Sequence, residues 1–119
     1  MSQQVSVHFA RSEFECRCGC GFDTIDAATL EILEAVRIHF DSPVSVTSGA
    51  RCPAHNRSVG GAKSSQHLLG RAADIQVKGV EPDAVYAFIA DNWPEASIGL
   101  YSSFTHVDTR TNGPARWHQ

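Results

Sequence analysis

The sequence predicts a single α+β domain in which a small antiparallel or mixed sheet carries its helices on one side. Two segments space their apolar residues as amphipathic helices do, and four shorter segments alternate apolar and polar residues as half-buried strands do. Their order along the chain is helix, strand, long loop, strand, helix and then a hairpin of two strands. The 119 residues fit one domain, spanning residues 1–119, and are enough to enclose a hydrophobic core.

Residues 22–40 form the clearest predicted helix. Asp23 or Thr24 can cap its start, and Asp26 stands where a negative charge favours the first turn. The helix should end just before Pro43, because proline disfavours helical conformation in the residue that precedes it. The apolar positions that recur at helical spacing are Leu30, Leu33, Val36 and Phe40.

Two further segments accompany the predicted sheet. Residues 5–14 read as an entry arm, with Phe9 and Phe14 as its anchors in the core. Residues 80–93 are expected to form a second helix, with Pro82 near its first turn, where proline is well tolerated.

Alternating apolar and polar residues predict the strands. Residues 43–51 alternate valine with serine and threonine, and residues 71–77 alternate again, which places Asp74 on the polar face of its strand. Between these strands, residues 52–66 are rich in Gly, Ser, Asn and Pro and are expected to form a loop. Residues 97–101 and 104–110 read as a hairpin with a tight turn.

Composition excludes several classes of protein. The net charge of −3 and the lack of a basic run argue against a nucleic-acid partner. No apolar run approaches the length that crosses a membrane, so no membrane partner is expected. The N-terminus lacks the charged and apolar regions of a secretory signal. We therefore expect a monomer that is cytoplasmic as made, unless another protein releases it.

The four cysteines, Cys16, Cys18, Cys20 and Cys52, leave three interpretations open. They are small buried hydrophobic residues, or one disulfide runs from this cluster to Cys52, or they form a structural zinc site. The alternate spacing of the first three differs from the usual C-x-x-C pattern of zinc sites. A cytosolic origin argues against assuming disulfides.

Two histidines and a carboxylate predict a metal site. His67 lies in the loop ahead of Asp74, and Gly70 lets the chain turn between them. His106 and Asp108 are two residues apart on a strand, so both side chains point to the same face. Neutral imidazole and carboxylate oxygen are good zinc ligands, and three protein ligands leave a fourth position for water. Zinc lowers the pKa of that water to about 7, which makes hydroxide available at neutral pH.

The residues around this site carry a resemblance to a known family. Ser65 to Asp74 follow the pattern S-x-H-x-x-G-x-A-x-D, and H-V-D follows at residues 106–108, before a closing A-R-W. Together these motifs resemble the peptidase M15 family, the zinc D-Ala-D-Ala carboxypeptidase and phage endolysin group, over nearly the whole chain. The resemblance implies the zinc core that this group shares with the hedgehog signalling domain. It also implies that the zinc ligands are His67, Asp74 and His106.

The resemblance assigns further roles around the metal. Arg51 matches the family arginine that holds substrate near the zinc, and its planar fork suits a carboxylate or a polarised carbonyl. Ser65 is a candidate for binding substrate or for orienting neighbouring side chains. Ser48 is a second candidate for orienting neighbours. Tyr101 could donate a hydrogen bond to the oxyanion, although a tyrosine in a strand often only packs.

The general base is where the sequence departs from the family. Many members carry Glu or Asp three residues before the last histidine ligand, and this chain has Ser103 there. A serine hydroxyl is a poor proton acceptor near neutral pH. Asp108 is the candidate catalytic base because it shares a strand face with His106, and the alternative is that it only orients a ligand or Arg51.

Two functions follow from the resemblance. The first is a zinc metallopeptidase that hydrolyses peptide bonds of bacterial peptidoglycan stem peptides, as a D-Ala-D-Ala carboxypeptidase or an endopeptidase. In lacking a signal sequence, the chain resembles a phage or prophage lysis enzyme. The alternative is a non-catalytic zinc domain that binds cell-wall fragments or a protein partner, which the serine at position 103 keeps open.

Overall fold

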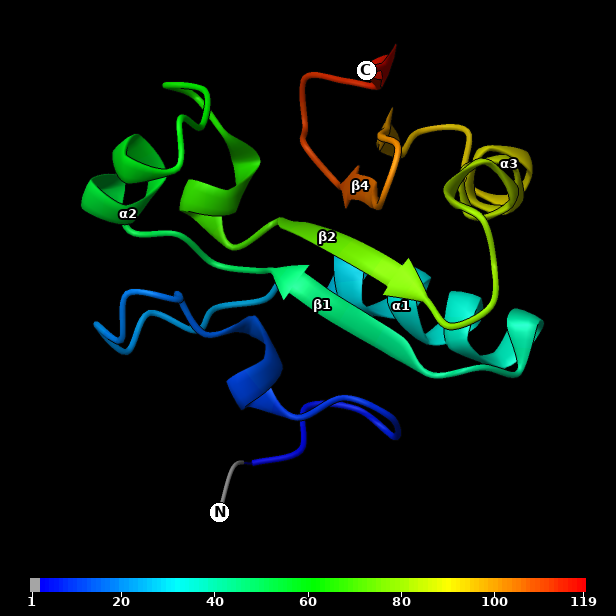
Figure 1. Cartoon of the computed structure of the whole chain (residues 1–119), viewed down its shortest axis with the longest axis horizontal. Coiled ribbons are helices and arrows are strands. Elements are labelled where there is room, and N and C mark those ends of the chain that lie inside the picture. Colours follow the sequence, from blue (N-terminus) through cyan, green and yellow to red (C-terminus); the bar gives the residue numbers. More distant parts are fainter. Residues whose placement is uncertain (1–2) are drawn as a thin grey trace.

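The computed structural model describes residues 3–119 and confirms an α+β arrangement built on a five-stranded mixed sheet (Figure 1). The strands lie side by side in the order β1-β2-β4-β3-β5. Neighbouring strands are antiparallel, except that β5 runs parallel to β3. The bounds are β1 Val44–Ser48, β2 Ala72–Val77, β3 Ser97–Leu100, β4 Thr105–Asp108 and β5 Arg116–His118.

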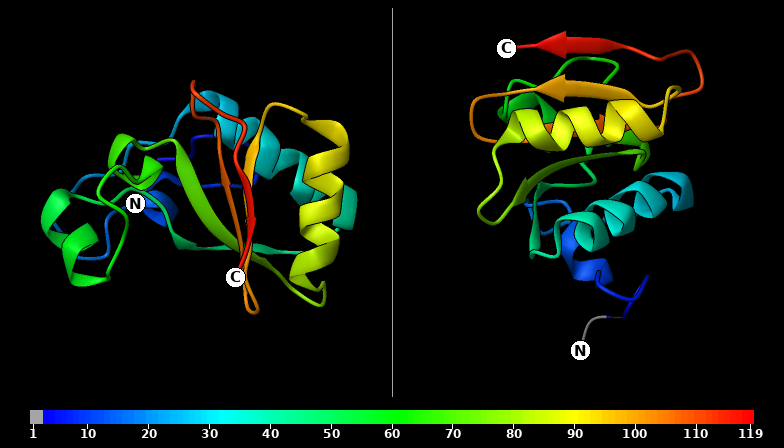
Figure 2. Two further views of the ribbon diagram at one scale, coloured as in Figure 1. Left: turned by 90° about the horizontal axis from the view of Figure 1, so that it is seen from above. Right: turned by 90° about the vertical axis from the view of Figure 1, so that its right-hand side faces the viewer.

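The two long helices cover one face of this sheet. In Figure 2, α1 and α3 lie together on one side of the strands, whereas α2 lies on the other side. Within residues 3–119, no helix combines the length and the apolar character that crossing a bilayer requires. The helices are α1 Ala27–Phe40, α2 Pro53–Ser58 and α3 Pro82–Asn92, with short 3-10 turns η1 Arg11–Phe14 and η2 Gln66–Leu69.

The hydrophobic core lies between the sheet and the two long helices. Strand β2 sends Ala73, Ile75 and Val77 to this face, as its alternation predicted. Phe9 and Phe14 are 1% and 0% exposed, which confirms that the N-terminal arm is anchored in the core. The other face of the sheet is therefore left for the polar residues of the same strands.

The start of α1 differs from the prediction. Neither Asp23 nor Thr24 caps the helix, because α1 begins at Ala27 and Asp26 is its N-cap. The Asp26 carboxylate accepts a hydrogen bond from the Ala28 N–H at 3.2 Å. The Asp26 N–H donates to the Gly70 carbonyl at 2.8 Å, and this long-range contact keeps residue 26 extended.

Two elements escaped the sequence prediction. The expected loop at residues 52–66 contains α2, whose first residue is Pro53 and whose N-cap is Cys52. A cysteine is not among the usual N-cap residues, so the local signal for this helix is weak. Strand β5 is only three residues long and pairs in parallel with β3, so nothing in its own sequence indicates pairing.

Candidate metal centre

One row of residues crosses the sheet and organises the site. Following the strand pairing, Ser48 on β1 lies opposite Asp74, Asp74 opposite His106, His106 opposite Gly99, and Gly99 opposite Trp117. A Cβ atom at position 99 would clash with the Trp117 ring. Glycine there lets the indole lie across β3, where its ring centroid is 5.1 Å from that of His106.

His67 reaches this row from the loop before β2. The 3-10 turn that carries it is capped by Ser65, whose Oγ accepts the His67 N–H at 3.2 Å. The turn ends at Gly70, which adopts a left-handed conformation with φ 69° and reverses the chain toward β2. The predicted loop, reversal and strand are therefore confirmed, and Ser65 acts as the cap of the turn.

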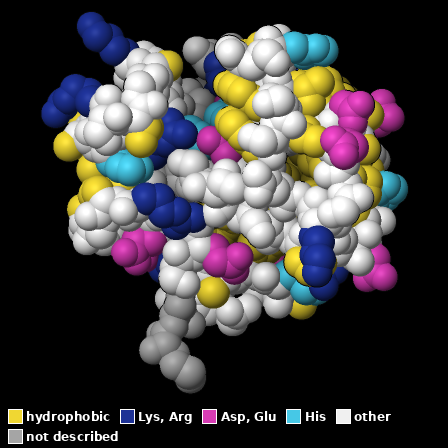
Figure 3. Space-filling view, in the orientation of Figure 1, with side chains coloured by type: hydrophobic (Ala, Val, Ile, Leu, Met, Phe, Trp, Pro, Cys, Tyr) yellow, Lys and Arg dark blue, Asp and Glu magenta, His cyan; other side chains and the backbone are white. Residues whose placement is uncertain are grey.

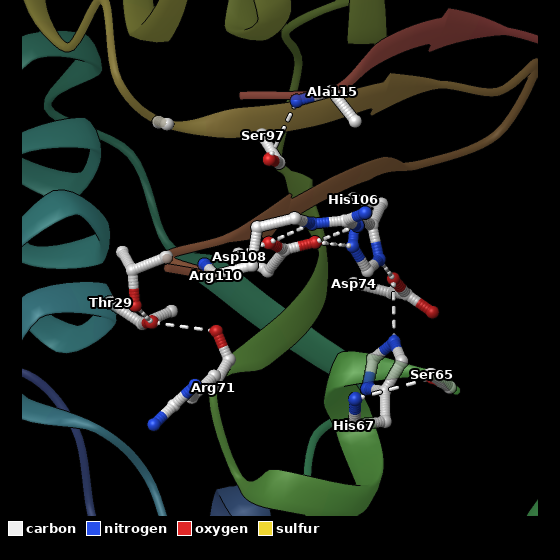
Figure 4. A network of polar contacts seen from close by, with 12 residues as sticks. Thr29, Ser65, His67, Arg71, Asp74, Ser97, His106, Asp108, Arg110 and Ala115 are labelled. Carbon is white, nitrogen blue, oxygen red and sulfur yellow. Dashed lines mark hydrogen bonds and ion pairs between the residues drawn. The ribbon is translucent and has the colours of Figure 1, made fainter. Parts of the chain in front are cut away.

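The hydrogen bonds behind the two histidines determine which ring nitrogens face Asp74. Figure 4 shows the contacts of His67 and His106 with Asp74, and that of His106 with Asp108. His67 Nδ1 lies 2.6 Å from the Gly49 carbonyl oxygen, which only accepts, so Nδ1 carries a proton. His106 Nε2 lies 2.7 Å from Asp108 Oδ2 and donates to it in the same way. The opposite nitrogens, His67 Nε2 and His106 Nδ1, lie 3.2 Å and 2.8 Å from Asp74 Oδ1.

These three atoms form a set of ligands that fits a metal ion. In the neutral rings, His67 Nε2 and His106 Nδ1 each carry a lone pair that points at a carboxylate oxygen. Because lone pairs repel a carboxylate oxygen, this arrangement needs a cation between them. One ligand atom from each of His67, Asp74 and His106 lies within 4.8 Å of the other two, and all three residues are buried. Two imidazoles and a carboxylate with an open fourth position are a donor set of catalytic zinc sites.

The electrostatics of the site favour a positive charge at the same place. Burial raises the pKa of the Asp74 carboxyl, but its contacts with His106 and His67 outweigh burial and hold the pKa well below its ordinary value. Burial lowers the pKa of His106, but Asp108 and Asp74 outweigh burial and raise it. Both shifts stabilise a positive charge next to Asp74, whether it is a proton on His106 or a bound cation.

Asp108 lies behind His106 and is 0% exposed. Its Oδ2 accepts from His106 and from the Arg110 guanidinium, at 2.7 Å each, and its Oδ1 accepts from Arg110 Nε at 2.9 Å. Burial alone raises the pKa of Asp108, but Arg110 and His106 lower it to about 2. This geometry favours the orienting role of Asp108 over that of a proton acceptor.

Arg110 is a residue of the site that the sequence prediction missed. It forms the bidentate ion pair with Asp108, and its guanidinium carbon lies 5.5 Å from the centroid of the Trp117 ring. Side chains two residues apart on an extended chain point to the same side. The spacing of Asp108 and Arg110 was therefore the sequence signal that could have predicted their contact.

Arg51 is fixed beside the ligands by three side chains. Its guanidinium donates to Ser48 Oγ at 3.0 Å, to Asn56 Oδ1 at 3.2 Å and to Asp74 Oδ2 at 3.3 Å. The Arg51 N–H also donates to the His67 carbonyl at 3.0 Å. The structure therefore places Arg51 beside Asp74, and the Ser48 hydroxyl is one of the groups that hold its guanidinium.

The ligands open onto a cleft of ≈ 700 Å³. Tyr101 lines this cleft, stacks on Phe104 with ring centroids 4.3 Å apart, and accepts a hydrogen bond from Trp117 Nε1 at 3.0 Å. Gln66 also lines it, and its Oε1 is buried without a hydrogen-bond partner in the part of the chain that the structure describes. Ser103 lies elsewhere, at a separate hollow.

The four cysteines form a second cluster. All four are free thiols, and one sulfur from each lies within 4.8 Å of the other three. Only Cys16 is buried, whereas Cys18 and Cys20 are exposed and Cys52 is half-buried. The interpretation as small buried residues therefore holds for Cys16 alone, and the alternative of a disulfide to Cys52 is not what the structure shows.

Comparison with known proteins identifies the family. No curated protein matches the chain. The family described as Peptidase M15 matches residues 7–108, a span that includes His67, Asp74, His106 and Asp108. Because this match covers most of the 119 residues, the chain belongs to the peptidase M15 family of zinc metallopeptidases.

Proposed function

We propose that the protein is a zinc metallopeptidase that hydrolyses peptide bonds in the stem peptides of bacterial peptidoglycan. The observation that carries the proposal is the convergence of His67 Nε2, Asp74 Oδ1 and His106 Nδ1 at the wall of an open cleft. These atoms would hold a zinc ion and leave one position free. A zinc ion held there would supply hydroxide for attack on a peptide carbonyl near neutral pH, because zinc lowers the pKa of a bound water to about 7.

Two side chains of the cleft are placed to stabilise the oxyanion of that reaction. The Arg51 guanidinium is fixed beside Asp74 at 3.3 Å and carries a permanent positive charge. The Tyr101 hydroxyl accepts from Trp117 Nε1, which leaves its own proton to be donated to a bound group. Donors that are fixed before the reaction are the most effective at stabilising developing charge.

The charge of the cleft wall supports an acidic peptide as substrate. Arg51 and Arg110 line the cleft, and the surrounding segment of residues 42–73 also carries Arg57, Lys63 and Arg71 but no Asp or Glu. Figure 3 shows Lys and Arg side chains gathered around α2 and the loop that follows it, and acidic side chains gathered over α3. Stem peptides carry free carboxylates, which a cationic wall attracts.

We infer that Asp108 orients His106 and does not act as the general base. Its carboxylate is 0% exposed and is not part of the cleft lining. Within residues 3–119, Asp74 is the only carboxylate that lines the cleft, and it is a ligand. This observation keeps a second function in view, a non-catalytic zinc domain that binds cell-wall fragments or a protein partner.

The test is mass spectrometry of purified peptidoglycan after incubation with the zinc-loaded protein. New peptide ends that disappear on chelation are expected, and their identity distinguishes a D-Ala-D-Ala carboxypeptidase from an endopeptidase. The His106→Ala variant is the matched control, because it keeps the cleft and removes one ligand.

The same samples separate the two functions. Products from the zinc-loaded protein that His106→Ala does not give support the peptidase. Intact peptidoglycan that co-sediments with a zinc-loaded protein, with no new peptide ends, would reject hydrolysis and favour the binding domain.

A further inference from the structure

We propose that Cys16, Cys18, Cys20 and Cys52 bind a second zinc ion, which is structural and separate from the His67–Asp74–His106 site. The four sulfur atoms lie within 4.8 Å of one another. Cys16 Sγ is 3.4 Å from Cys18 Sγ, and Cys18 Sγ is 3.6 Å from Cys52 Sγ. Four protein ligands fill a tetrahedral site, so this ion would have no position for a substrate.

The distances between the sulfur atoms match a tetrahedral zinc site. A Zn–S bond of about 2.3 Å places the sulfurs of a regular tetrahedron about 3.8 Å apart. The two measured separations, 3.4 Å and 3.6 Å, are close to this edge and far from the roughly 2.0 Å of a disulfide bond. A tetrahedral set of four thiolates is typical of zinc.

The loop of residues 16–22 is shaped to gather three of these thiols. On an extended chain, alternate side chains share a side but lie about 7 Å apart. Gly19 and Gly21 have φ angles of 82° and 94°, and these left-handed conformations curl the loop. The Cys16 N–H donates to the Phe22 carbonyl at 2.7 Å and closes the curl. Spacing that does not resemble a C-x-x-C pattern therefore still brings the sulfurs together.

Backbone N–H groups point at the sulfur atoms, as they do around bound thiolates. The Cys52 N–H donates to Cys16 Sγ, and the His55 N–H donates to Cys52 Sγ, at 3.4 Å each. A thiol that is still protonated releases its proton to solvent when zinc binds.

The cluster joins two parts of the chain that lie far apart in the sequence, residues 16–20 and Cys52. Residues 15–26 contain no helix or strand. The segment is attached near β1 through the Arg17 guanidinium, which donates to the Val46 carbonyl at 2.7 Å. A zinc ion shared with Cys52 would cross-link this segment to the start of α2. Metal ligands substitute for core packing where a short segment cannot bury enough apolar surface.

This cross-link would also stabilise one wall of the catalytic cleft. Cys52 directly follows Arg51, and Cys52 is the N-cap of α2. Within α2, Asn56 accepts from the Arg51 guanidinium at 3.2 Å and donates to the Ala62 carbonyl at 2.9 Å. The second zinc would therefore fix both the backbone of Arg51 and the side chain that orients it.

The test is the metal content of the full chain purified under reducing conditions. Two zinc ions per chain are expected by elemental analysis and native mass spectrometry. The cobalt(II)-substituted protein should show the sulfur-to-metal charge-transfer absorption of a thiolate site, which a His-Asp-His site cannot give. One zinc per chain and no thiolate band in the cobalt protein would overturn the proposal. Both measurements are made on the unaltered protein, so they do not depend on whether a variant folds.

Variants then assign each ion to its site. The double variant Cys18→Ser/Cys20→Ser changes two exposed residues and should lose one zinc and the cobalt–thiolate band. The matched control is His55→Ala, which removes a possible ligand three residues after Cys52 and should keep both ions. His106→Ala should lose the other zinc and retain the thiolate band, so failure at the catalytic site is distinguished from failure at the cysteine site. A double cysteine variant that keeps two zinc ions would refute the assignment.

Discussion

His106 donates through Nε2 to the buried carboxylate of Asp108 at 2.7 Å. In the neutral ring this contact leaves Nδ1 without a proton, and Nδ1 is the atom that faces Asp74. Asp108 therefore determines which nitrogen of His106 is available to a metal, although it does not reach the metal position itself. Partners of this kind fix the tautomer and raise the basicity of a ligand imidazole.

Replacing Asp108 with asparagine should weaken zinc binding. The amide keeps the size of the side chain but loses the negative charge that holds the His106 Nε2–H and the Arg110 guanidinium. We expect zinc affinity to fall by about 10–100-fold, which is typical for the loss of a partner behind a ligand histidine. Competition with a chromophoric chelator measures the change.

The matched control for this variant is Asp91→Asn, at an exposed position of α3. It makes the same chemical change far from the ligands and should leave zinc affinity unaltered. If Asp108→Asn instead bound zinc normally and lost turnover, Asp108 would be the general base.

The stability of the metal-free protein should depend on Asp108 in acid. The folded pKa of Asp108 is about 2, whereas an Asp in an unfolded chain has a pKa of about 3.9. A carboxyl whose pKa is lowered by folding contributes stability above its unfolded pKa, and this contribution disappears as the pH falls from about 4 to about 2. The difference corresponds to roughly 2–3 kcal/mol of unfolding free energy.

Denaturant unfolding at several pH values with chelator present tests this expectation. The gap in unfolding free energy between wild type and Asp108→Asn should be largest above pH 5 and shrink toward pH 2. Curves that stay parallel over this range would show that Asp108 gains nothing from its charge in the folded protein.

Trp117→Phe should impair turnover without loss of the metal. Phenylalanine keeps an aromatic ring next to His106 but lacks the Nε1–H that donates to the Tyr101 hydroxyl at 3.0 Å. If Tyr101 stabilises the oxyanion, kcat should fall by roughly tenfold, as expected for about one hydrogen bond. KM and zinc content should change little, because the ligands keep their partners.

Trp93→Phe is the matched control, since Trp93 follows α3 and packs on Phe88, away from the cleft. Steady-state kinetics on the peptide identified from peptidoglycan compares the two variants. An equal loss in both would reduce the effect of Trp117→Phe to a general loss of packing.

The side-chain faces of the strands were predictable because the period of a strand is two. Alternation in residues 71–77 placed Asp74 and Ile75 on different faces of their strand, and the same rule placed His106 and Asp108 on one face. The structure confirms both placements. The motif around Gly70 likewise indicated the reversal that delivers His67.

The residues that the sequence did not reveal depend on long-range pairing. Trp117 reaches His106 only because the three-residue β5 pairs with β3 across Gly99, and no local pattern announces that register. The cap of α1 moved from Asp23 or Thr24 to Asp26 because Gly70, far along the chain, accepts the Asp26 N–H. Local propensity has no access to such contacts.

Arg51→Lys tests the cation beside the ligands. Lysine keeps the positive charge but cannot reproduce the planar contacts to Ser48, Asn56 and Asp74. We expect kcat/KM to fall by about 100-fold, comparable to the removal of one oxyanion donor, while bound zinc is retained. Zinc content and kinetics measured on the same preparation separate the two effects.

The control for Arg51→Lys is Arg57→Lys, at an exposed position of α2 that is not part of the cleft lining. It should keep full activity, because lysine preserves the positive charge of position 57 near the cleft. Zinc lost in Arg51→Lys would mean that the guanidinium mainly holds Asp74 in place. Unchanged kinetics in both variants would mean that charge alone, without the fork of donors, is sufficient at position 51.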